Sequence, residues 1–263
     1  MSDEIVHLTV ESGVATITLD SPKNRNAISG RLVTELTARL AAVTGDQSVR
    51  VVVLTHTGGT FCAGADLTEA TAAGQSIEEA SDSRTRSMVD LMRAILELPK
   101  PVIAKIDGHV RAGGLGLVGA CDIAVAGPAS TFALTEARLG VAASIVSLTL
   151  LPRMSSRAAS RYYLTAEKFD AETAERIGLI TAAAEDADTA VVALTAEIRL
   201  CSPQGLAESK KLVTAPVLRE FDAHATDLAT LSGRLFRSEE ARAGMMAFLS
   251  KQQPPWVAGA VVE

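Results

Sequence analysis

Residues that build metal sites and disulfides are scarce in this sequence. Its 263 residues include three cysteines and four histidines, with no CxxC or HxxxH spacing among them. An odd number of cysteines without such spacing is typical of free thiols in a reducing compartment. We therefore expect buried thiols at Cys62, Cys121 and Cys201 and a cytoplasmic protein. We expect no metal site, because no carboxylate cluster with ligand spacing accompanies the histidines.

An excess of positive charge and long hydrophobic runs are also missing. The formal net charge is −6, and no basic stripe with interleaved aromatic residues occurs, which argues against a nucleic-acid partner. No apolar run approaches the roughly 20 residues of a membrane span. The first residues, Met1-Ser2-Asp3-Glu4, are acidic where a signal peptide is basic. We therefore expect neither membrane insertion nor export.

The sequence does contain enough apolar material for a large core. Hydrophobic residues make up 48% of it, and the mean hydropathy is +0.23. These values exclude disorder, and the length fits one large domain or one domain with a small helical appendage.

Hydrophobic periodicity predicts strands that alternate with helices. A hairpin is expected from residues 7–10 and 15–19, followed by a helix capped by Ser29. Apolar runs predict buried strands at residues 49–55, 102–106 and 123–126. Because helical segments separate these runs, crossover ββα units are favoured over a meander.

The part of the chain after Ser144 has an almost entirely helical pattern. Helix caps are expected at Asp170, Ser202 and Ser238, and Pro203 suits the first position of its helix. The sequence therefore predicts a C-terminal helical layer.

Two glycine-rich turns carry the strongest functional signal. They are Thr60-Phe61-Cys62-Ala63-Gly64-Ala65-Asp66 and Arg111-Ala112-Gly113-Gly114-Leu115-Gly116, and each follows an apolar strand-like run. Together the turns are suited to present two backbone N–H groups to one carbonyl oxygen. Such preorganised donors stabilise the negative charge that develops on a reacting carbonyl, commonly the largest single catalytic contribution.

The second turn also contains a dinucleotide-binding pattern, GxGxxG, at residues 114–119, with Glu136 further along. In a dinucleotide fold the acidic residue ends the next strand. Glu136 instead lies at the expected start of a helix, so we interpret the glycines as helix-packing and anion-binding positions.

These turns, in their order and spacing with further motifs, resemble the crotonase superfamily, the enoyl-CoA hydratases and isomerases. The resemblance extends from about residue 5 to residue 256. The further motifs are Asn24-Arg25-Asn26-Ala27-Ile28, Lys100-Pro101-Val102-Ile103-Ala104, Ala120-Cys121-Asp122-Ile123-Ala124, Phe132-Ala133-Leu134-Thr135-Glu136 and Met246-Ala247-Phe248-Leu249-Ser250-Lys251.

The resemblance implies an α/β fold with a crotonase-like spiral of repeated ββα units over residues 1–195. Residues 196–263 would form a C-terminal helical trimerisation region, and the protein would be a homotrimer or a homohexamer. The substrate would be an acyl-CoA thioester, so coenzyme A would belong to the substrate and no separate cofactor is expected.

The resemblance also implies roles for individual residues. Ala65 and Gly113 would donate the oxyanion-hole hydrogen bonds, and Glu136 would be the general acid and base. Substrate and CoA contacts would come from Arg25, Ala63, Asp66, Leu67, Arg111, Gly114, Phe248 and Lys251. For Asp66 we favour a helix-capping role. Arg111 would contact a substrate carboxylate or a CoA phosphate, or be an ordinary loop arginine.

The sequence departs from the two-glutamate hydratases at Gly116, where those relatives carry a second glutamate. A lost acid–base group commonly costs a factor of about 10² to 10⁴ in rate. A hydratase subgroup with branched glutaconyl-CoA-type substrates resembles this chain and also lacks that glutamate, and single-glutamate isomerases exist as well. The expectation is therefore a hydratase, with an isomerase or a catalytically silent CoA-binding protein as alternatives. The acyl pocket would be lined by residues 74–86 and 141–147.

Overall fold

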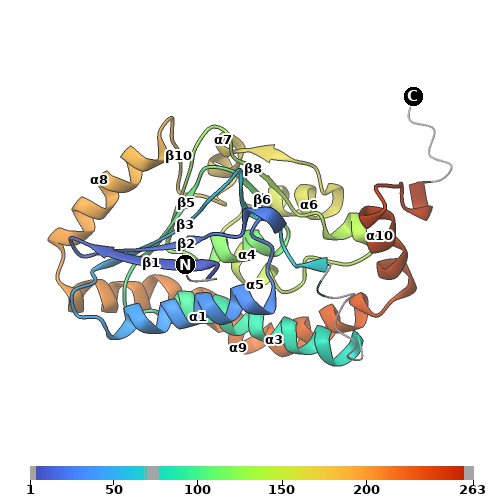
Figure 1. Cartoon of the computed structure of the whole chain (residues 1–263), viewed down its shortest axis with the longest axis horizontal. Helices are drawn as coiled ribbons and strands as arrows, with labels where there is room; N and C mark the ends of the chain where they lie inside the picture. Colours follow the sequence, from blue (N-terminus) through green and yellow to red (C-terminus); the bar gives the residue numbers. More distant parts are fainter. Residues whose placement is uncertain (1–3, 68, 70–76, 258–263) are drawn as a thin grey trace.

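The computed structural model describes residues 4–67, 69 and 77–257, and its strands form two sheets (Figure 1). The larger sheet has six strands in the order β1-β2-β3-β5-β7-β10, and the smaller sheet has four in the order β4-β6-β8-β9. The larger sheet consists of β1 (Val6–Glu11), β2 (Val14–Leu19), β3 (Val51–His56), β5 (Val102–Ile106), β7 (Ile123–Ala126) and β10 (Ala182–Ala183). The smaller sheet consists of β4 (Thr60–Cys62), β6 (His109–Arg111), β8 (Thr131–Ala133) and β9 (Phe169–Asp170).

From β3 to β8, consecutive strands alternate between the two sheets. The pairs β3-β4, β5-β6 and β7-β8 each place one strand in the larger sheet and the next in the smaller sheet. Helical segments follow these pairs: α3 (Ile77–Glu97), α4 (Gly113–Ala120) and the 3-10 helix η2 (Glu136–Leu139). Apart from the antiparallel pairs β1-β2 and β8-β9, the described strand pairs are parallel. The expected spiral of ββα units is confirmed.

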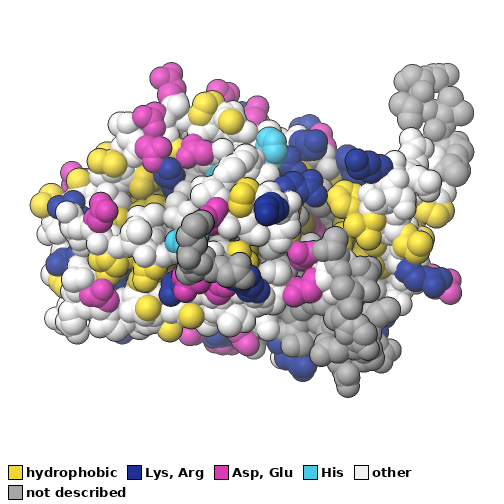
Figure 2. Space-filling view, viewed as in Figure 1, with side chains coloured by type: hydrophobic (Ala, Val, Ile, Leu, Met, Phe, Trp, Pro, Cys, Tyr) yellow, Lys and Arg dark blue, Asp and Glu magenta, His cyan; other side chains and the backbone are white. Residues whose placement is uncertain are grey.

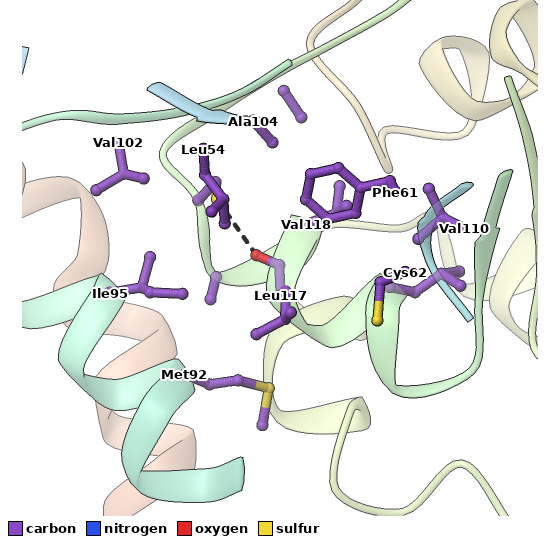
Figure 3. Packing of buried hydrophobic residues seen from close by; sticks show 14 of the residues in the cluster. Leu54, Phe61, Cys62, Met92, Ile95, Val102, Ala104, Val110, Leu117 and Val118 are labelled. Atoms are coloured by element: carbon purple, nitrogen blue, oxygen red, sulfur yellow. Dashed lines mark hydrogen bonds between the residues drawn. The ribbon is translucent and has the colours of Figure 1, made fainter. Parts of the chain in front are cut away.

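The continuous apolar runs of the sequence are explained by burial on both faces of the larger sheet. In β3, Val52 and Leu54 belong to the main core, whereas Val51 and Val53 pack on the other face, near α8 (Ala187–Leu200). Figure 3 shows part of the main core, where Leu117 of α4 lies between Leu54 of β3 and Met92 of α3. Parallel strands buried on two faces need apolar residues at successive positions rather than at alternate ones.

The predicted helix caps are present. Ser29, Asp170, Ser202 and Ser238 each accept a hydrogen bond from a backbone N–H in the first turn of the following helix. These helices are α1 (Gly30–Gly45), α7 (Ala171–Arg176), α9 (Pro203–Phe236) and α10 (Glu239–Leu249). In Figure 1, α1, α3 and α9 lie along one side of the sheets, and α10 lies at the far end from α8. Short helices complete the chain: η1 (Pro22–Asn24), α5 (Ser147–Leu150), α6 (Ser156–Thr165) and η3 (Pro255–Val257).

Three expectations need correction or comment. The region after Ser144 is nearly all helical, as expected, but it also contains the two-residue strands β9 and β10, which extend the two sheets. Cys201 is exposed, whereas Cys62 and Cys121 are buried as expected. The expected domain boundary at 195/196 falls inside α8 and stays a prediction.

Residues 74–76 of the expected pocket wall lie outside the described residues, and α3 begins at Ile77. Within the described part of the chain, no helix is both long and apolar enough to cross a membrane. The same residues contain no group of three or more His, Cys, Asp or Glu side chains that could hold a metal ion.

Candidate active site

The first glycine turn follows β4 and is bonded to the loop before α1. The Ala63 N–H donates to Arg25 O, the Ile28 N–H donates to Gly64 O, and the Asp66 N–H donates to Ile28 O. Gly64 has φ +86°, a left-handed conformation that glycine adopts without steric cost. These bonds leave the N–H of Ala65, between Gly64 and Asp66, pointing away from the partner strand.

The side chain of Asn26 fixes this loop from inside the protein. It is fully buried, accepts a hydrogen bond from Ser21 N–H, and donates to Thr57 O and Thr60 O. Its φ is +53°, a conformation that asparagine tolerates better than most residues. Sequence reasoning named Asn26 only as part of a motif. An asparagine in the turn before the first helix was the available signal for its role.

The second glycine turn links β6 to α4. Ala112 has φ +47° and ψ −122°, which is a strained conformation for a residue with a side chain. Its N–H donates to Ala133 O on the neighbouring strand β8. Gly113 is the first residue of α4, so its N–H has no intrahelical acceptor and lies at the positive end of the helix dipole.

The two turns are in direct contact. A Cβ added to Gly64 would lie 2.8 Å from Ala112 Cβ, and one added to Gly113 would lie 4.0 Å from Ala65 N. Among the described residues, neither the Ala65 N–H nor the Gly113 N–H donates to a protein acceptor. The structure therefore brings together two unused backbone donors from separate ββα units. This is the arrangement that an oxyanion requires.

Glu136 follows strand β8 of the smaller sheet, next to the second turn. It comes three residues after Ala133, whose partner in β6 is Arg111, and it begins η2. Its Oε2 atom is buried and has no hydrogen-bond partner among the described residues, although the residue as a whole keeps some exposure. Desolvation raises the pKa of Glu136 to about 7, with a smaller opposing effect from its own backbone N–H. A carboxyl group with this pKa can both accept and donate a proton near neutral pH.

The position of the missing second glutamate is filled by apolar side chains. A Cβ on Gly116 would lie 2.7 Å from Val146 Cγ1, 2.9 Å from Met92 Sδ and 3.3 Å from Met88 Cε. Thr149 Oγ1 on α5 donates to Gly116 O. The backbone of α4 is thus packed closely against α3 and α5, which leaves no room for a carboxylate at this position.

The glycines of the GxGxxG pattern have the same packing role. A Cβ on Gly114 would lie 2.8 Å from Cys62 Cβ, and one on Gly119 would lie 2.8 Å from Thr149 Oγ1. Gly114 itself is buried and serves the contact between α4 and the first turn, and its role toward a substrate stays a prediction.

The residues expected to bind CoA are spread around the two turns. Arg25 is exposed, and Ala63 and Leu67 are partly buried. Asp66 Oδ1 accepts from Glu69 N–H and its Oδ2 accepts from Asn24 Nδ2, which agrees with the favoured capping role. The Arg111 guanidinium donates to Val110 O, Thr131 O and Thr131 Oγ1, so its role toward a substrate stays a prediction.

Phe248 lies in the last turn of α10, and Lys251 follows the end of this helix. This helix packs on η2 so closely that a Cβ on Gly244 would lie 2.6 Å from Leu139 O. Phe248 is 53% exposed and Lys251 is also exposed. Figure 2 shows hydrophobic side chains gathered at this end of the molecule.

Comparison with known proteins agrees with this geometry. The model of the family "Enoyl-CoA hydratase/isomerase" matches residues 9–259. A Rhodobacter capsulatus protein named "Probable enoyl-CoA hydratase" is 33% identical over 257 residues, covering 97% of this chain and 98% of its own. A crystal structure of an enoyl-CoA hydratase from Mycobacterium avium is 58% identical, has a TM-score of 0.90, and covers 97% of this chain and 100% of its own. An enoyl-CoA hydratase from Mycobacterium smegmatis is 30% identical with a TM-score of 0.78, covering 97% and 99%.

The fold is that of the crotonase superfamily. Within that class, the chain belongs to the enoyl-CoA hydratase/isomerase family.

Proposed function

We propose that the protein is an enoyl-CoA hydratase that adds water to a 2-enoyl-CoA thioester. The observation that carries this proposal is the combination at one site of two unused backbone donors, Ala65 N–H and Gly113 N–H, with the unpartnered carboxyl oxygen of Glu136. The names of the relatives from Rhodobacter capsulatus and Mycobacterium avium support the same reaction class.

The proposed reaction uses the donors and the carboxylate in sequence. Ionised Glu136 takes a proton from water as the water oxygen bonds to C3 of the substrate. The electron pair of the C2–C3 double bond forms a C1–C2 double bond while the carbonyl pair moves to the thioester oxygen, where the Ala65 and Gly113 N–H groups stabilise the negative charge. The thioester carbonyl then re-forms as C2 takes the proton from Glu136. One water has been added, and Glu136 is ionised again.

Isomerisation of a 3-enoyl to a 2-enoyl thioester is the second candidate. It is favoured by Gly116, because the space beside it is occupied by Val146 and Met92 and holds no second carboxylate. One carboxyl group suffices to carry a proton from C4 to C2, and the same two N–H groups would stabilise the intermediate enolate. Thioester binding without turnover is the remaining alternative.

The proposal extends to substrate contacts, assembly and location. Arg25, Lys251 and the other expected contact residues surround the turns or lie on α10, where a CoA moiety would pass. Phe248 on this exposed helix end suits contact with a second subunit. We therefore also propose that the protein is a homotrimer or a homohexamer in the cytoplasm.

The decisive experiment is mass spectrometry of 2-enoyl and 3-enoyl CoA thioesters incubated with the pure protein in deuterated water. A hydratase adds one D₂O to the 2-enoyl substrate, and Glu136→Gln abolishes this addition. Glu240→Gln, which changes an exposed carboxylate on α10, is the matched control and should retain activity. Conversion of the 3-enoyl substrate without addition of water would identify an isomerase, and binding unaffected by Glu136→Gln without turnover would identify a silent CoA-binding protein.

A further inference from the structure

A second unpartnered polar group belongs to helix α6, which packs against η2. The hydroxyl oxygen of Tyr163 is buried and has no hydrogen-bond partner among the described residues. The ring itself is partly buried against the main core. A buried hydroxyl group without a partner costs about 1–3 kcal/mol, so such a group in a native protein points to a ligand or a water that satisfies it.

The nearby charge that acts on Tyr163 is that of Glu136. Burial raises the pKa of Tyr163, and the negative charge of Glu136 raises it further. The two side chains are therefore close enough to interact, yet no direct hydrogen bond joins them. Glu136 Oε2 and Tyr163 Oη are thus two buried, unsatisfied atoms within electrostatic reach of each other.

Other titratable groups around this pair are engaged elsewhere or exposed. Arg138 on η2 donates to Thr165 O, and Arg161 on α6 pairs with Glu167. On α10 the titratable residues are Glu239, Glu240 and Arg242, which are exposed. Arg157 on α6 is exposed as well. Water screens exposed charges strongly, so the Tyr163 hydroxyl is the buried group of the packed elements that the charge of Glu136 reaches.

We propose that Tyr163 is a water-positioning residue of the site, and that its hydroxyl group and the Glu136 carboxylate bind the same water molecule, the one added to the substrate. This inference rests on the proposed hydratase function. A phenol both donates and accepts hydrogen bonds, so Tyr163 Oη accepts one O–H of this water while Glu136 Oε2 accepts the other. Tyr163 thereby supplies, from α6, the second acceptor that Gly116 on α4 does not provide.

The shared site can be tested without any enzymatic assay. The chain contains two tyrosines, so a protein with ¹³Cζ-labelled tyrosine gives two resonances, which Tyr162→Phe assigns. We expect the Tyr163 resonance to shift with pH around the Glu136 pKa of about 7 and to stay constant in Glu136→Gln. A Tyr163 resonance that is constant in the wild type, or that still titrates in Glu136→Gln, would overturn the proposal.

Kinetics test the positioning role. Tyr163→Phe keeps the ring and should lower kcat for hydration on the order of 10- to 100-fold, because a misplaced reactant loses its preorganisation, while KM stays unchanged. The acid limb of the kcat–pH profile should move to higher pH, because the carboxylate of Glu136 loses polar stabilisation. Tyr162→Phe is the matched control, since Tyr162 is buried against Phe169 with ring centroids 4.1 Å apart.

The outcomes separate this inference from the proposed function. Wild-type kcat in Tyr163→Phe, in a protein that hydrates 2-enoyl-CoA, would overturn the role of Tyr163 and leave the hydratase function intact. Absence of hydration in the wild type would overturn the hydratase function, and with it the role of the bound water in the reaction. The Tyr163 resonance would still decide whether Tyr163 and Glu136 share a site.

Discussion

The buried carboxyl group of Glu136 makes the stability of the protein depend on pH. Its pKa is raised from the usual 4.5 to about 7 in the folded protein. A raised pKa contributes stability that is fully present below the unfolded-state pKa of 4.5. This contribution is lost as pH rises to and through the folded-state pKa of about 7. Glu136→Gln cannot ionise, so it should exceed the wild type in unfolding free energy above pH 7 by up to about 3 kcal/mol, since each pKa unit corresponds to about 1.4 kcal/mol.

Urea unfolding of both proteins at several pH values measures this difference. The difference should be largest at pH 8 and should shrink progressively as pH falls through 7 toward 4.5. An equal difference at all pH values would mean that Glu136 is not the ionising group responsible.

Gly116 is constrained by its neighbours rather than by its backbone conformation. A Cβ here would approach Val146 Cγ1 to 2.7 Å, and overpacking of this kind commonly costs about 1–3 kcal/mol. Gly116→Ala should therefore lower the unfolding free energy by that amount, and Gly116→Glu should lower it more without creating a two-glutamate site. Gly45→Ala is the control, because nothing lies within 4 Å of its added Cβ.

A double-variant cycle identifies the contact that causes the loss. If Val146 is the obstacle, Gly116→Ala combined with Val146→Ala should lose less stability than the sum of the single variants. Strict additivity would contradict this explanation.

Among the structural elements, the first glycine turn depends on one left-handed residue. Gly64→Ala would force a side chain into φ +86° and within 2.8 Å of Ala112 Cβ. Because the two turns position the two N–H donors, we expect kcat/KM to fall roughly 100-fold, the scale of a 1 Å misplacement. Gly59→Ala in the preceding loop is the control, since its Cβ meets nothing within 4 Å. Unchanged kcat/KM in folded Gly64→Ala would contradict the oxyanion role of this turn.

Features of these elements that depend on neighbouring residues in the chain could be predicted from the sequence. The cap at Ser29 bonds to Leu32 N–H, three residues away, and the glycine turns follow strands with clear apolar runs. The strands β9 and β10 could not be predicted, because each has two residues and forms only where a distant strand offers a partner. The same holds for the site, since the proximity of Tyr163 to Glu136 results from the packing of α6 on η2.

At the scale of the whole molecule, one buried lysine attaches α9 to the sheet core. Lys210 is 5% exposed, and its ammonium group contacts Asp122 Oδ2 at 2.7 Å, Ile95 O at 2.8 Å and Lys100 O at 3.1 Å. All three N–H groups thus have an acceptor. Lys210→Met removes the cation from the buried Asp122 carboxylate, which keeps Val102 N–H as a donor, so we expect a loss of about 3–5 kcal/mol. The exposed neighbour Lys211 is the control, and Lys211→Met should change the unfolding free energy by less than about 1 kcal/mol.

Chemical denaturation measures both variants. A loss in Lys210→Met no larger than that in Lys211→Met would show that the buried pair does not hold α9 in place.

The exposed apolar end of α10 predicts self-association. Met246, Phe248 and Leu249 are 63%, 53% and 45% exposed, and contiguous exposed apolar residues commonly mark interfaces. We expect sedimentation velocity to show a trimer or a hexamer and Phe248→Glu to shift it toward monomer. Val192→Glu, at an equally apolar residue with 67% exposure on α8, is the control at the other end of the molecule (Figure 1).

The Phe248→Glu variant also tests whether assembly supports the active site. A Cβ on Gly140 in the Glu136 segment would lie 2.7 Å from the Glu240 backbone of α10, so this helix contacts η2 without intervening side chains. If neighbouring subunits hold α10 in place, the monomeric Phe248→Glu protein should lose kcat together with assembly, whereas Val192→Glu should keep both. A monomeric wild type would contradict the assembly prediction, and a fully active Phe248→Glu monomer would show that packing within one subunit is sufficient to position Glu136.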